Sequence, residues 1–95
     1  MLDRLRYMEV GMPNFTKIEI EKARHGLVEL EESILSVLHN NPEGLRNSEI
    51  AKGLGIESHF NGKQRNYLTY SIIGLLMAKG LIRKKEKDLP IYILK

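Results

Sequence analysis

The clearest hydrophobic pattern in the chain lies between residues 23 and 38. Apolar side chains recur there at helical spacing, at Ala23, Leu27, Leu30, Ile34, Leu35 and Leu38. Steps of three and four residues place such side chains on one face of a helix. Residues 39–42 read His-Asn-Asn-Pro, and because proline cannot continue a helix, we expect the helix to end there.

The pattern before this helix supports two interpretations. Thr16-Lys17-Ile18-Glu19 has the spacing of a capping box, which predicts a helix from about residue 17. Isoleucines alternate with charged residues over 17–21, however, which favours a strand. We therefore treat residues 1–24 as an N-terminal extension that the pattern assigns to neither helix nor strand. Residues 25–95 are treated as the folded domain.

Two more helices follow. Asn47 or Ser48 is placed to cap a short helix whose apolar face holds Ile50, Ala51 and Leu54. Gly55 is suited to a left-handed residue at its end. The next helix has its predicted core stripe at Leu68, Ile72, Leu75 and Leu76. It ends at Lys79-Gly80, a cation and a glycine that both suit a helix C-terminus.

The remaining segments are extended. Residues 81–85 and 91–94 read as strands, and residues 86–90 join them into a β-hairpin. Residues 45–46 form a short extended piece between the first two helices.

The stretch Asn-Ser-Glu-Ile-Ala-Lys-Gly-Leu-Gly-Ile at 47–56, with Ala-Lys-Gly-Leu-Ile at 78–82, resembles winged helix-turn-helix domains of bacterial and archaeal regulators. The resemblance covers about residues 27–94. It implies an α+β fold, a winged helix with a three-helix helix-turn-helix core and a C-terminal β-hairpin wing. It also implies a DNA-binding transcriptional regulator whose third helix reads the major groove while the wing contacts the backbone.

One segment departs from that pattern. Residues 57–78, between the second helix and the Lys-Gly-Leu-Ile junction, number 22, whereas the usual turn is about three or four residues long. The polar residues 57–63 therefore predict either an expanded turn or a third helix that begins early.

Charge is distributed unevenly along the chain. The net charge is +3, but residues 61–95 hold eight basic and two acidic residues, a net +6, and residues 1–60 hold seven and ten, a net −3. From Ser58 to Lys85, 28 residues contain no carboxylate. This asymmetry favours a surface that faces a polyanion, although a solvated hairpin tip would also account for the basic run.

The candidate contact residues lie on the third helix and the wing. With Leu68 at the centre of the buried face, the far side of the helix holds Asn66, Tyr70 and Gly74, and Gln64 and Arg65 fall in its first turn. Amide, guanidinium and phenol groups suit base edges and phosphates. The predicted DNA-binding residues are Lys63, Gln64, Arg65, Asn66, Tyr67, Thr69, Tyr70, Arg83, Lys84, Lys85 and Lys87.

Little in the sequence indicates catalysis. The chain has no cysteine, and its three histidines lack metal-ligand spacing. We therefore expect no catalytic residue, no metal and no cofactor. No apolar run approaches the ~20 residues of a membrane span, and we expect a cytoplasmic protein.

Three functions compete. The first is a double-stranded DNA-binding module. The second is a winged helix for protein interaction, with Tyr67, Tyr70 and Met77 as an aromatic contact patch. The third is the DNA-targeting part of a restriction–modification-type system, because residues 61–70 are similar to such modules. We also expect a homodimer, with residues 1–24 either pairing with a second copy or packing on their own domain.

Overall fold

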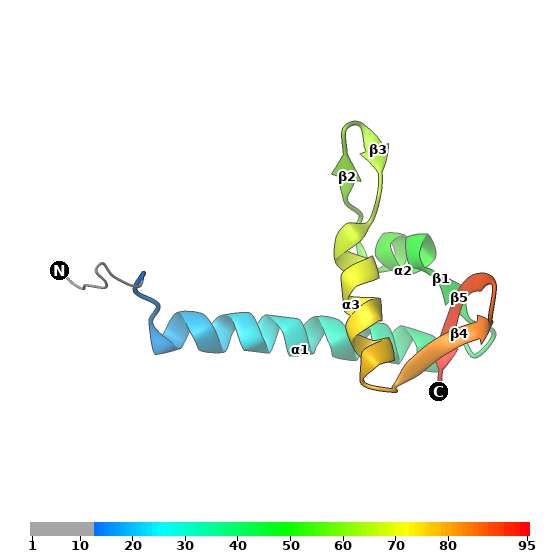
Figure 1. Ribbon diagram of the computed structural model, residues 1–95, viewed down its shortest axis with the longest axis horizontal. Helices are drawn as coiled ribbons and strands as arrows, with labels where there is room; N and C mark the ends of the chain where they lie inside the picture. The colour runs from blue at the N-terminus through cyan, green and yellow to red at the C-terminus, as the bar shows by residue number, and fades with distance from the viewer. Residues whose placement is uncertain (1–12) are drawn as a thin grey trace.

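The computed structural model describes residues 13–95, apart from the side chains of Phe60 and Gln64. Within these residues the chain is α+β, with three helices, a small antiparallel three-stranded sheet and a separate two-stranded hairpin (Figure 1). The predicted α+β class is confirmed. The first twelve residues of the predicted extension lie outside the described part.

Helix α1 spans Lys17–His39 and begins where the capping box predicts. Thr16 and Glu19 make both reciprocal capping hydrogen bonds, at 2.9 and 3.2 Å, so the helical interpretation of residues 17–21 is confirmed. The helix runs without interruption through residues 24 and 25, where the sequence suggested that the domain begins.

Only the C-terminal half of α1 contributes to the core. Ile34 and Leu38 are 0% and 1% exposed. Leu27, which the periodicity places in the core, is 38% exposed, and that expectation is wrong. The physical reason is that α1 projects beyond the other elements on its N-terminal side (Figure 1).

Strand β1 (Leu45–Arg46) leads directly into helix α2 (Asn47–Leu54). The cap of α2 is one residue earlier than predicted, because Arg46 holds the cap position and its N–H donates to Glu49 Oε1 at 2.7 Å. The end of α2 is as predicted, with Gly55 at a φ of 73°.

The unusual segment after α2 is a β-hairpin. Strands β2 (His59–Phe60) and β3 (Lys63–Gln64) pair antiparallel, and the hairpin extends beyond the start of helix α3 (Figure 1). Both turn residues have positive φ, 52° at Asn61 and 73° at Gly62. Such angles belong to the type I′ turn that Asn-Gly favours.

Helix α3 spans Tyr67–Ala78, so Gln64 and Arg65 precede it rather than form its first turn. Its buried side chains are Thr69, Ile72, Ile73 and Leu76. Leu68 and Leu75, predicted as core, are 45% and 43% exposed. The predicted phase of the helix was therefore wrong by about one residue.

The sheet has the order β1–β5–β4, with β4 at Ile82–Glu86 and β5 at Leu89–Leu94. The connection between β4 and β5 is two residues long, shorter than the predicted 86–90. Ile82 and Tyr92 anchor the sheet to the helices, at 2% and 4% exposure. The core around them consists of Ile34, Leu38, Ile50, Ile72, Ile73, Leu76, Ile82 and Tyr92.

Candidate nucleic-acid interface

The β2–β3 hairpin is fixed to the start of α3 by hydrogen bonds around Ser58. The Ser58 carbonyl accepts from the N–H groups of Arg65 and Asn66 at 3.0 and 3.2 Å. The Ser58 hydroxyl accepts from the N–H of Tyr67 at 3.1 Å, which satisfies a free donor of the helix N-terminus. The basic hairpin and α3 thus share one anchored junction.

Asn66 completes that junction and is not available to a ligand. It is 4% exposed, and its Oδ1 accepts from the Ser58 N–H at 3.1 Å. Its backbone is left-handed, with a φ of 54°, and its carbonyl accepts from Asn47 Nδ2 at 3.3 Å. The predicted placement of Asn66 on an exposed reading face is wrong, because its side chain holds the hairpin closed.

Thr69 also belongs to the interior. It is 0% exposed, although it is one of the predicted DNA-binding residues. Its position follows from the corrected phase of α3, which turns it toward Ile72, Ile73 and Leu76 on the buried side. Burial excludes contact between the Thr69 side chain and nucleic acid.

The exposed face of α3 is apolar and aromatic. The helix contains no charged residue, and five of its large side chains are exposed by 38% to 60%, namely Tyr67, Leu68, Tyr70, Leu75 and Met77. All the basic side chains around α3 therefore come from the hairpins and loops on either side of it.

The β2–β3 hairpin supplies two of these cations. Lys63 and Arg65 are exposed, and no ion pair joins either of them to another described residue. The side chain of Gln64, between them, lies outside the described atoms.

The β4–β5 hairpin supplies four more, and Lys79 at the end of α3 is paired with Glu31. Arg83 Nη1 donates to the carbonyls of Lys84 and Lys85 at 3.1 and 3.3 Å, so its guanidinium lies along its own strand. Lys85 Nζ contacts Glu43, at 3.1 Å from the carbonyl and 3.4 Å from the carboxylate. Lys84 and Lys87 are exposed, and no ion pair to the rest of the described chain holds them.

Lys84 borders a hollow of about 270 Å³ between α3 and the sheet. The lining residues are Tyr70, Ile73, Gly74, Met77, Lys84 and Tyr92. Burial, and secondly the charge on Tyr70 when it is ionised, raises the pKa of the Tyr92 phenol. The hollow therefore combines two phenol side chains, a lysine and an apolar floor.

The structure thus separates the predicted DNA-binding residues into exposed and buried side chains. Eight of the eleven side chains are exposed along the two hairpins and the helix between them: Lys63, Arg65, Tyr67, Tyr70, Arg83, Lys84, Lys85 and Lys87. Asn66 and Thr69 are buried. The junction at Ser58 was not predicted, although the Asn61-Gly62 pair is typical of a tight hairpin turn and signals the β2–β3 hairpin in the sequence.

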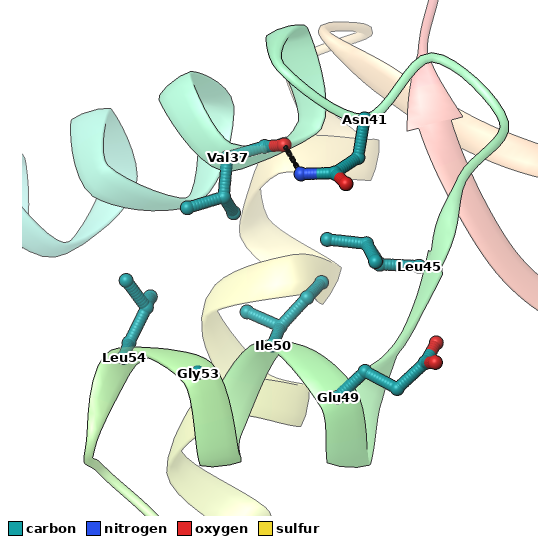
Figure 2. Close-up of a pocket in the computed structure, with 7 residues that line it drawn as sticks. All are labelled: Val37, Asn41, Leu45, Glu49, Ile50, Gly53 and Leu54. Atoms are coloured by element: carbon teal, nitrogen blue, oxygen red, sulfur yellow. Dashed lines mark hydrogen bonds between the residues drawn. The ribbon is translucent and has the colours of Figure 1, made fainter.

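A second hollow, of about 240 Å³, lies between α1, β1 and α2. Figure 2 shows Val37, Leu45, Ile50 and Leu54 directed toward one another across it. Its polar groups are already engaged, since Asn41 Nδ2 donates to the Val37 carbonyl at 2.7 Å and Glu49 caps α2. The lining of this hollow is therefore mainly apolar.

Two other kinds of site have no support in residues 13–95. No group of three or more His, Cys, Asp or Glu side chains there could hold a metal ion. No helix among the same residues has the length and apolarity needed to cross a membrane. Comparison of the chain with protein-family models, curated proteins and solved structures gave no match.

Proposed function

We propose that this chain is a winged helix-turn-helix module that binds double-stranded DNA, as the DNA-binding domains of bacterial and archaeal transcriptional regulators do. The observation that carries the proposal is the placement of charge around α3. Basic hairpins precede and follow this helix, and the whole segment from Ser58 to Lys85 lacks a carboxylate. A cationic surface of this kind suits the phosphate backbone.

The element order supports the winged-helix part of the proposal. A helix, a strand, two helices and a hairpin, with the first strand beside the last, are what that architecture requires. The β2–β3 hairpin replaces the short turn between the second and third helices. It adds a second basic projection at the start of α3.

The proposed contacts differ from those first expected. Lys63 and Arg65 contact phosphates on one side of α3, and Lys84 and Lys87 contact them on the other. Tyr67 and Tyr70 lie toward the groove, where aromatic and apolar surface can meet a thymine methyl group. Because Asn66 and Thr69 are buried, most of the affinity for DNA comes from contacts with the DNA backbone. Contacts with the base edges contribute little.

The test is a salt titration of binding to a random-sequence duplex, followed by fluorescence anisotropy. The logarithm of the association constant should fall linearly with the logarithm of salt concentration, with a slope of about −0.9 per phosphate contacted. Arg65→Glu combined with Lys84→Glu should weaken binding and reduce the magnitude of the slope by about two, because two phosphate contacts are lost.

The control is Lys95→Glu, a single charge reversal at an exposed position at the open end of the β4–β5 hairpin, away from its tip. It should leave the slope unchanged. A wild-type affinity that stays flat with salt, or an equal loss of affinity with Lys95→Glu, would contradict the proposal.

The exposed apolar face of α3 favours a second candidate, a protein-interaction winged helix. Tyr70 is 60% exposed and Met77 38%, and a patch of this composition is typical of protein interfaces. The same titration separates the two candidates. A protein without measurable duplex affinity, but with a partner lost on Tyr70→Ala, would support the second.

A further inference from the structure

Within residues 13–95, no other element covers the N-terminal half of α1. All residues from 13 to 29 are exposed, and this half projects away from the other elements (Figure 1). Leu30 is the first half-buried residue of the helix and Glu31 the first buried one. About 13 helical residues, or some 20 Å of helix at 1.5 Å per residue, thus extend beyond the domain.

Local interactions specify this half of the helix. The reciprocal hydrogen bonds of Thr16 and Glu19 close its first turn. Phe15, just before the cap, lines a surface hollow together with Ile20 in the second turn. These are the positions of a hydrophobic staple, which fixes the direction in which a chain enters a helix.

The exposed half carries the same apolar stripe as the buried half. Ile20, Ala23, Leu27, Leu30 and Ile34 follow one another in steps of 3, 4, 3 and 4, which is the a/d pattern of a coiled coil. Ile20 and Leu27 are 42% and 38% exposed, whereas Ile34 is fully buried. The apolar face that packs on the domain core therefore continues along the exposed N-terminal half of α1.

Apolar side chains of α3 adjoin this stripe where α1 and α3 meet. Lys79 Nζ and Glu31 Oε2, 2.8 Å apart, join the two helices. One turn before Lys79 lies Leu75 of α3, which is 43% exposed. The surface is larger than one helix alone could offer, which matters because a stable interface needs roughly 1,000 Å² or more.

We propose that this surface binds the same surface of a second copy of the chain, with the exposed halves of two α1 helices packed antiparallel. The segment suits self-association because its charges balance: Lys17, Lys22 and Arg24 are offset by Glu19, Glu21 and Glu29. The orientation follows from the stripe. The C-terminal continuation of the stripe is buried in the domain core. Parallel helices would therefore place the two domains on the same side of the helix pair, where they would compete for the same space.

This surface is separate from the proposed DNA-binding face. Leu68 shares its side of α3 with Leu75, seven residues later, and precedes Tyr70 by two residues, so Leu68 and Tyr70 point about 200° apart around the helix. Tyr70 lines the hollow beside the β4–β5 hairpin. A dimer formed through α1 therefore leaves both basic hairpins accessible.

Sedimentation equilibrium of the full chain, without DNA, tests the proposal. The wild-type mass should approach twice the 10.9 kDa of the chain as concentration rises from micromolar to submillimolar. Ile20→Lys combined with Leu27→Lys should return the mass to that of one chain. Ile18→Lys is the matched control, because Ile18 is 65% exposed and lies on the opposite side of the helix, and this variant should remain dimeric.

Orientation can be read from disulfides, since the chain has no cysteine. A mixture of the single variants Ile20→Cys and Leu27→Cys should form mainly mixed disulfides if the helices are antiparallel. A monomeric wild type, equal dissociation by Ile18→Lys, or disulfides between identical positions would overturn the proposal. None of these results depends on DNA binding, so this inference and the proposed function can fail separately.

Discussion

At the scale of single residues, Gly44 is the described glycine at which an added side chain would be most crowded. Its φ is +97°, and a Cβ there would lie 2.5 Å from Ile91 Cγ2 and 2.9 Å from Ile93 Cγ2. Gly44→Ala should therefore combine backbone strain of about 1–2 kcal/mol with an overpacking cost of about 1–3 kcal/mol. Urea unfolding should show a loss of stability of about 2–5 kcal/mol, the sum of the two costs.

Gly55 provides the comparison for that measurement. It also has a positive φ, of +73°, but a Cβ there would meet nothing within 4 Å. Gly55→Ala should cost only the backbone strain, about 1–2 kcal/mol. Equal losses of stability in the two variants would mean that the contact of residue 44 with Ile91 and Ile93 does not contribute to the free energy of unfolding.

At the scale of elements, the sequence predicts α1 well and α3 poorly, for one physical reason. The C-terminal half of α1 has polar residues opposite its stripe, so only one orientation buries its apolar side chains. The α3 sequence Tyr-Leu-Thr-Tyr-Ser-Ile-Ile-Gly-Leu-Leu-Met-Ala has apolar residues on nearly every side. Periodicity then does not show whether the buried face of α3 contains Leu68 and Leu75 or Ile73 and Leu76. Packing against α1, α2 and the sheet determines which face is buried.

In the candidate site, the exposure of the basic side chains could be predicted from the sequence. The burial of the uncharged polar side chains could not. Lys63, Arg65, Lys84 and Lys87 are exposed as expected, because no burial competes for a solvated cation. The burial of Asn66 depends on Ser58, eight residues away, and on a left-handed backbone that helical spacing does not reveal. Strands β2 and β3 are two residues each, too short for an alternating pattern.

The junction of the β2–β3 hairpin with α3 yields a prediction that separates a structural role for Asn66 from a base-reading role. Asn66→Ala removes the acceptor for the Ser58 N–H and places alanine at a φ of 54°. The two effects together should cost about 2 kcal/mol. Asn66→Gly relieves the backbone strain and should cost about 1 kcal/mol, the value of the hydrogen bond.

Thermal or urea unfolding of both Asn66 variants gives the order of stability. Selection from random duplex DNA with each variant, at a temperature where it is folded, gives its base preference. We expect the stability order wild type, glycine, alanine, and an unchanged base preference. A changed preference without a loss of stability would restore Asn66 as a reading residue.

At the scale of the whole molecule, the two proposals assign opposite ends of the chain to different tasks. The balanced charges and apolar stripe of residues 17–29 suit association with an identical surface. The carboxylate-free segment from Ser58 to Lys85 suits a polyanion. The core that holds these two surfaces together is small, which makes each buried side chain between α3 and the sheet important for global stability.

Tyr92 is such a side chain, and it makes the stability of the whole fold depend on pH. It is 4% exposed, and burial, followed by the charge on Tyr70, raises the pKa of its phenol. In the unfolded chain the phenol ionises at about pH 10, while in the folded protein it stays protonated to higher pH. The unfolded state thus loses its proton first, so stability is constant below about pH 10 and falls as pH rises toward the folded pKa.

Urea unfolding of the wild type and of Tyr92→Phe between pH 8 and pH 11 isolates this effect, because the lysines titrate in both proteins. Phenylalanine keeps the ring in the core and cannot ionise. The difference in free energy of unfolding should therefore be constant up to about pH 10 and then move in favour of Tyr92→Phe. Its limit is about 1.4 kcal/mol for each pH unit that separates the folded and unfolded pKa values. A difference that stays constant to pH 11 would show that the phenol ionises equally well in both states, and that the space between α3 and the sheet is open to water.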